Sequence, residues 1–136
     1  MNAALWWWVF HQLTATAVYA VMLWPTWFVH TWLGRAGMYA FVGTLAMIIL
    51  AGNLRIHLSF TARAYPDELA YQRRRVRTWI RIGDYGFSAA MVFIGVAIVE
   101  AHNWWGALFV AVGLCAALVY LVIEPTTARA AFGREQ

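Results

Sequence analysis

The sequence predicts an all-α protein that forms a four-helix transmembrane bundle, with a basic cytoplasmic loop between helices 2 and 3. The chain has 136 residues, of which 63% are hydrophobic and only 12% charged. A soluble domain is about half apolar and roughly a quarter charged. Aromatic residues make up 17% and include nine Trp, which suits aromatic belts at both membrane interfaces. The composition therefore indicates a single integral membrane domain over residues 1–136.

The first predicted span covers about residues 5–31. No Asp, Glu, Lys or Arg occurs between positions 3 and 34, and about 20 apolar residues are enough to cross a bilayer. Pro25 removes a backbone donor, so we expect a kink near the far end. Inside this span His11 and Gln12 are polar groups that need a hydrogen-bond partner from another helix.

Three further spans follow at about residues 36–57, 80–101 and 104–123. The second helix is expected to continue beyond the lipid to about Ala64. Pro66, Asp67 and Glu68 then indicate a helix start, because Pro fits a first helical turn and acids stabilise the positive end of the helix dipole. The basic segment after them is expected to run directly into the third span. Glu124 and Pro125 are expected to end the fourth span, before a short polar tail.

The arginines predict the orientation. Nine of the ten lie in the loop and helix ends between spans two and three or in the C-terminal tail, and only Arg35 lies on the other side. By the positive-inside rule both termini and the long loop are cytoplasmic, as expected in the inner membrane of a bacterium. The basic segment is interpreted as a surface for anionic lipid headgroups rather than for nucleic acid, since no nucleic-acid-binding motif accompanies it. Its residues are Arg73, Arg74, Arg75, Arg77 and Arg81.

Four histidines suggest an alternative function. His11 and His57 are expected near the inner face, and His30 and His102 near the outer face. A di-haem cytochrome needs this arrangement, because each b-type haem takes an axial imidazole from each of two facing helices. Interfacial or hydrogen-bonded histidines are the other interpretation.

The order of His11, Pro25 and His30 in the first span is similar to that in two membrane families, the haem-containing protoporphyrinogen oxidases and the copper-resistance D type proteins. The resemblance extends from His11 to His30, and the second half of the chain lacks the polar pattern of either family. It implies a haem-associated or metal-associated environment for the first span and no particular activity.

Two acids border the third span. Between Asp84 and Glu100 the uncharged stretch is about 22 Å long at 1.5 Å per residue, shorter than the ~30 Å hydrocarbon core. At least one acid must therefore lie at or inside the lipid boundary and face the protein interior. Asn53 and Arg55 are expected near Asp84, in a buried polar or ion-paired group. The group either fixes helix register or belongs to a proton path.

Small residues recur four apart, a spacing that permits close packing of helices within the bundle or against a partner. They are Gly86 and Ala90, Ala107 and Ala111, and Gly113 and Ala117.

No nucleophile elbow, phosphate-binding glycine loop or zinc-protease motif occurs. The leading interpretation is a small non-catalytic accessory subunit of a larger, energy-converting membrane complex, whose partners are the lipid bilayer and other membrane protein subunits. A b-type haem cytochrome is the first alternative, and a small dimeric proton-coupled transporter is the second.

Overall fold

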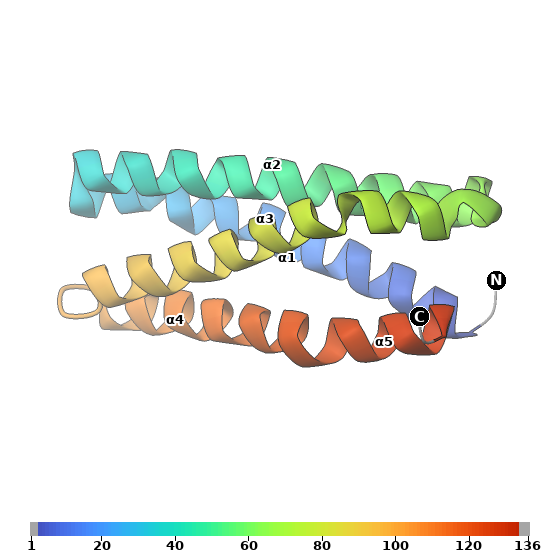
Figure 1. Cartoon of the computed structure of the whole chain (residues 1–136). Helices are drawn as coiled ribbons and strands as arrows, with labels where there is room; N and C mark the ends of the chain where they lie inside the picture. Colours follow the sequence, from blue (N-terminus) through green and yellow to red (C-terminus); the bar gives the residue numbers. More distant parts are fainter. Residues whose placement is uncertain (1–2, 134–136) are drawn as a thin grey trace.

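The computed structural model describes residues 3–133 and contains four long helices that form a bundle of two hairpins (Figure 1). Helix α1 (Ala3–Leu33) and helix α2 (Arg35–Ala64) form the first hairpin. Between them Gly34 has a φ of 56°, a conformation that glycine adopts without steric cost. A short 3₁₀ helix, η1 (Pro66–Glu68), leads into α3 (Leu69–Ile98).

The last helical segment is continuous but irregular. It comprises α4 (Asn103–Leu118), a π-helical turn η2 (Val119–Ile123) and α5 (Glu124–Phe132). The expected end at Glu124 and Pro125 is therefore wrong. Pro125 falls in the first turn of α5, where a missing backbone N–H costs little, so the helix continues through it. The tail after residue 133, including Arg134, lies outside the described residues.

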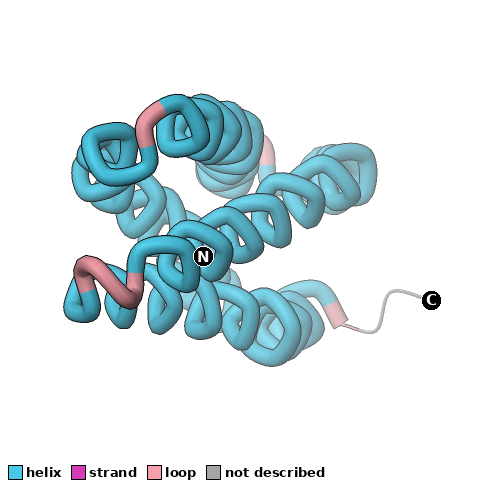
Figure 2. Tube along the Cα trace, turned by 90° about the vertical axis from the view of Figure 1, so that its left-hand side faces the viewer, coloured by secondary structure: helices cyan, strands magenta, loops and turns pink. Residues whose placement is uncertain are grey.

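The two hairpins pack through α2 and α3, and α5 packs against α1 at the end that holds both termini (Figure 1). Figure 2 shows the four helices arranged around one another in the view down the bundle. The tight turns after α1 and α3 lie together at the opposite end (Figure 1). Both termini therefore share one end of the bundle with η1.

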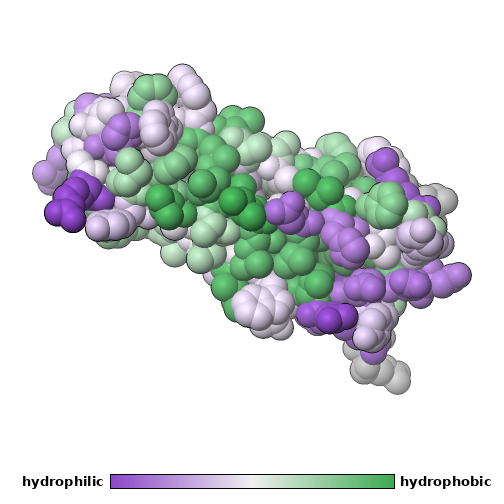
Figure 3. Space-filling view, turned by 90° about the horizontal axis from the view of Figure 1, so that it is seen from above, coloured by the Kyte–Doolittle hydropathy of each residue, from purple (hydrophilic) through white to green (hydrophobic). Residues whose placement is uncertain are grey.

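Two groups of buried side chains form the core. The larger group lies between the hairpins and includes Met22, Phe87, Met91, Ile94 and Phe109. The smaller one surrounds Trp8 at the end that holds the termini. Only some of the apolar side chains are buried in this core. Many other large apolar residues lie on the outer surface of the bundle. On the face shown in Figure 3 they form a broad zone across the middle, and hydrophilic residues gather mainly toward the two ends.

Three helices are long and apolar enough to cross a membrane: Arg35–Ala64, Pro66–Ile98 and Asn103–Phe132. Helix α1 has 31 residues and no charged side chain from Ala3 to Leu33 except the titratable His11 and His30. Its six Trp and four Thr residues, together with His11, Gln12 and His30, lower its mean hydropathy. The structure thus supports the all-α bundle and contact with a lipid bilayer.

Candidate functional site

A buried polar network joins both hairpins and is the candidate functional site. At its centre is Arg55 on α2, which is only 1% exposed. Its Nη2 lies 2.5 Å from Asp84 Oδ2 on α3 and 3.0 Å from Glu124 Oε2 on α5. Its Nη1 donates a hydrogen bond to Gln12 Oε1 on α1. A single guanidinium group therefore connects four helices.

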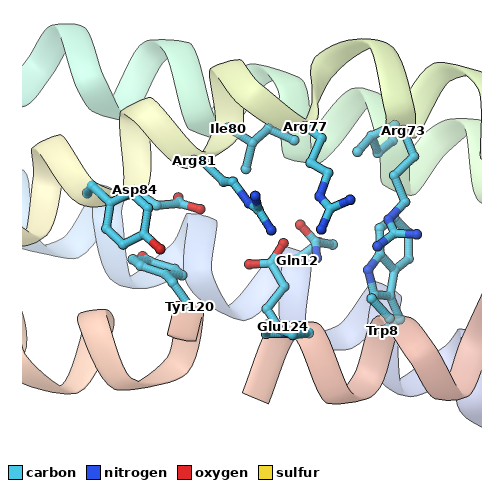
Figure 4. Close-up of a pocket in the computed structure, with 13 residues that line it drawn as sticks. Trp8, Gln12, Arg73, Arg77, Ile80, Arg81, Asp84, Tyr120 and Glu124 are labelled. Carbon is cyan, nitrogen blue, oxygen red and sulfur yellow. The ribbon is translucent and has the colours of Figure 1, made fainter. Parts of the chain in front are cut away.

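Two tyrosines extend this network. Tyr19 Oη on α1 donates to Asp84 Oδ1 at 2.5 Å, and it is also hydrogen-bonded to Tyr120 Oη. The guanidinium carbon of Arg55 lies 5.5 Å from the centre of the Tyr120 ring. Figure 4 shows Tyr120 beside Asp84, with Glu124 farther along the same helix. We refer to these six residues as the Arg55 network: Gln12, Tyr19, Arg55, Asp84, Tyr120 and Glu124.

The π-helical turn is the local feature that positions two members of the network. Tyr120 lies inside η2 and Glu124 follows directly after it. A π turn holds one more residue than an α turn, which rotates the side chains beyond it around the helix axis. Such turns are frequent at functional sites. Tyr120 and Glu124 are four residues apart and share one face of the helix, and both contact Arg55.

The network lies far from the end that holds the two tight turns. At 1.5 Å per residue, Arg55 is about 30 Å from Arg35 along α2, and Asp84 about 24 Å from Glu100 along α3. In a bundle that spans a ~30 Å hydrocarbon core, these groups would lie in the part of the core, and at the boundary, nearer the end that holds the termini. Charges at such depth are costly unless they are paired and hydrogen-bonded. Arg55 and Asp84 meet this condition.

The arrangement has two chemical capacities. As a set of ion pairs, it fixes the rotation and depth of four helices relative to one another. As a chain of hydroxyl and carboxyl groups, Tyr120, Tyr19, Asp84 and Glu124 offer oxygens that can hold or pass a proton. No three His, Cys, Asp or Glu side chains within residues 3–133 lie close enough to hold a metal ion.

The other two residues expected in a buried polar group lie on the surface of the bundle instead. Asn53 is exposed, and its Nδ2 donates to Ile49 O one turn earlier. Glu100 is exposed in the turn after α3. Asn53 points away because it is two positions from Arg55, and residues two apart lie on different faces of a helix. Glu100 lies two residues beyond the end of α3, at the end of the bundle.

Three of the four histidines pack against aromatic rings. The rings of His11, His30 and His102 pack against Phe10, Trp27 and Trp32 respectively. His30 Nδ1 is also hydrogen-bonded to Trp27 O. His11 lines an apolar groove of about 290 Å³ beside α4 and η2. His57 on α2 has an exposed side chain.

The five arginines of the basic segment form two groups along α3. Arg73, Arg77 and Arg81 line a small cavity beside the Arg55 network, because residues four apart lie on one face of a helix. The Arg73 guanidinium also lies 4.6 Å from the centre of the Phe132 ring. Arg74 and Arg75 are exposed and do not line this cavity.

The small residues differ in what they face. A Cβ added at Gly86 would lie 2.7 Å from Met47 Sδ on α2, and one at Gly113 would lie 2.8 Å from Ser88 O on α3. These glycines therefore serve close packing inside the bundle. Ala90 and Ala117 are half-buried, and Ala107 and Ala111 are exposed on α4.

Sequence reasoning did not find Tyr19, Tyr120 or Glu124 as members of this site. A tyrosine in an apolar span has no local signature that distinguishes a network member from an interface residue. Depth was an available signal for Tyr19, which lies well inside the predicted span 5–31, but not for Tyr120, which lies three residues from the end of the span 104–123. Glu124 was interpreted only as the end of a span. Gln12 was expected to need an outside partner, and the structure shows that this partner is Arg55.

No protein-family model, curated protein or solved structure matches the chain.

Proposed function

We propose that this chain is a small non-catalytic subunit of a larger, energy-converting membrane complex, crossing the membrane four times with both termini in the cytoplasm. The observation that carries the proposal is a groove on the outer surface between α2 and α3. Its volume is about 570 Å³ and its lining is almost entirely apolar. The lining residues are Ala36, Tyr39, Ala40, Gly43, Thr44, Met47, Gly86, Ala89, Ala90 and Phe93.

The composition of this α2–α3 groove suits a transmembrane helix of another subunit. Most of its lining residues are Gly or Ala, and small residues allow the backbones of two helices to approach closely in lipid. Thr44 Oγ1 in the groove wall is buried and lacks a hydrogen-bond partner. A hydroxyl of this kind can form an interhelical hydrogen bond, which supports helix association in membranes.

Gly43 provides a test that leaves the bundle intact. A Cβ added there meets no atom within 4 Å, so Gly43→Leu fills the groove without disturbing α3. After extraction in mild detergent, the native protein is expected to migrate with a larger assembly, and Gly43→Leu is expected to separate from it with an unchanged melting temperature. Ala107→Leu is the matched control, because Ala107 is an exposed small residue on α4.

Two outcomes would contradict the proposal. One is a native protein that runs as a monomer or a symmetric dimer at every detergent strength. The other is a Gly43→Leu variant that stays with the assembly as firmly as Ala107→Leu. Gly113→Leu is not a suitable probe, since its side chain would collide with α3 and destabilise the bundle itself, by ~1–3 kcal/mol for typical overpacking.

The Arg55 network favours a second candidate, proton-coupled transport. Intramembrane acids commonly mark proton or ion paths. Asp84 accepts hydrogen bonds from both Tyr19 and Arg55, and Glu124 provides a second carboxylate, with 30% of its side chain exposed. In this candidate function Asp84 and Glu124 would exchange protons between the bundle interior and the cytoplasmic side. Glu100, exposed at the opposite end, has no contact with the network.

A further inference from the structure

A small cavity opens beside the Arg55 network at the end of the bundle that holds the termini. Its volume is about 40 Å³, and its walls come from α1, α3, η2 and α5, with Leu58 of α2. A cavity needs about 10–15 Å³ to hold one water molecule. This cavity therefore has room for about three waters, or for the oxygens of one phosphate group. Figure 4 shows the side chains of Arg73, Arg77 and Arg81 entering it from α3, opposite Trp8 and Glu124.

Trp8 gives the cavity an unused hydrogen-bond donor. Its side chain is 1% exposed, and its indole Nε1 has no hydrogen-bond partner. Trp8 lines the cavity, and in Figure 4 its indole nitrogen lies on the cavity side of the ring. Indole N–H is a donor only, and a buried donor without an acceptor costs free energy. An acceptor inside the cavity would remove this cost.

The charge balance favours an anion as that acceptor. Arg77 and Arg81 line the cavity, and Arg55 contacts its two lining carboxylates, Asp84 and Glu124. These three positive groups and two negative groups leave a net charge of one positive. Both carboxylates already accept from Arg55, so their repulsion of an added anion is reduced. The cavity therefore combines positive charge with a donor that lacks an acceptor.

The depth of the site agrees with a phosphate at the inner membrane surface. Along α3, Arg81 and Arg73 lie about 29 and 40 Å from Glu100 at 1.5 Å per residue. The hydrocarbon core is about 30 Å thick, and the headgroup layers extend the bilayer to about 40–45 Å. In a spanning bundle the three arginines would therefore lie at the level of the inner headgroups.

We propose that this cavity binds one phosphate group through Trp8 Nε1 and the guanidinium groups of Arg77 and Arg81. The phosphate belongs either to a phospholipid headgroup or to free phosphate, and the chemistry of recognition is the same for both. Arginine is suited to this role because its planar fork of donors matches phosphate oxygens. The inference does not depend on the proposed accessory function.

The test uses the full-length protein in two experiments. In one, native mass spectrometry counts the phospholipids that remain bound after extraction from vesicles of phosphatidylglycerol and phosphatidylcholine. In the other, inorganic phosphate is titrated into lipid-depleted protein in detergent, and the ¹H–¹⁵N signal of the Trp8 indole is followed by NMR. Trp8→Phe keeps a ring but removes the N–H, and it also assigns the signal.

We expect one retained phospholipid or a saturable shift of the Trp8 indole signal. The double substitution Arg77→Gln with Arg81→Gln is expected to weaken binding at least about tenfold, the effect of losing charge-assisted hydrogen bonds. Trp8→Phe is expected to weaken it about three- to tenfold. The matched control, Arg74→Gln with Arg75→Gln, removes the same charge outside the cavity and is expected to change binding less than about twofold.

The two experiments also identify the source of the phosphate. Retained phospholipid without a response to inorganic phosphate identifies a headgroup site, and the reverse result identifies a free-phosphate site. Equal weakening by the two double substitutions would overturn the proposal, since it would show general attraction to positive charge. The absence of binding in both experiments would also overturn it, because the cavity would then hold only water.

Discussion

The substitution Arg55→Leu tests whether the Arg55 network holds the bundle together. It removes the cation from a site that is 1% exposed. Asp84 would then keep the hydroxyl of Tyr19 as its hydrogen-bond donor, and its carboxylate would be buried without a counter-charge. Breaking a buried pair in this way typically costs ~3–5 kcal/mol. We expect a loss of unfolding free energy in that range.

The substitution Asp84→Asn is expected to be milder in the wild-type protein. Arg55 would keep Glu124 at 3.0 Å and its bond to Gln12, and the Asn oxygen still accepts hydrogen bonds. We expect a cost of ~1–3 kcal/mol, the range for impaired hydrogen bonds to charged groups. In the Arg55→Leu background the sign should reverse, because Asp84→Asn then removes an unpaired buried charge.

This reversal is measurable by reversible unfolding of all four proteins of the double-mutant cycle in mixed detergent micelles, followed by circular dichroism. Arg74→Leu serves as a control for loss of an exposed arginine, with an expected effect within about 0.5 kcal/mol. If Asp84→Asn destabilised both backgrounds equally, the two residues would not be coupled, and the argument that Arg55 compensates Asp84 would be refuted.

Three further predictions address topology, transport and cofactor binding. A reporter fused after Gln136, or inserted near Asp67, is expected to report a cytoplasmic location, because nine of ten arginines lie on that side; a periplasmic signal from either would reverse the orientation. If the network carries protons, Asp84→Asn in liposomes should abolish a wild-type proton flux while the protein remains folded, and an unchanged flux would exclude that role. If histidine pairs bind b-type haem, the reduced protein should show a strong Soret band that His11→Ala or His102→Ala diminishes. A colourless protein from haem-replete cells would exclude the cytochrome alternative.

The sequence alone predicted the helices and their ends with few errors. Lipid imposes this regularity, since a spanning segment must be long, apolar and internally hydrogen-bonded. A run without charged residues therefore predicts α1, and the turn at Gly34 is a local feature of the chain. The end at Pro125 was misjudged because a proline can begin a helical segment as well as end one, and the π-helical turn before it has no clear sequence signal.

The tertiary structure alone decided which polar groups meet. Gln12 and Arg55 are 43 positions apart, and Tyr19 and Tyr120 are 101 apart. Their pairing depends on the rotation of each helix about its own axis, and one residue of difference turns a side chain by about 100°. Local sequence specifies that a buried charge needs a partner, but only the packing of the two hairpins determines the identity of that partner. The same rotation brings Gly113 into close contact with α3. It also places the Trp8 indole in one cavity with three arginines.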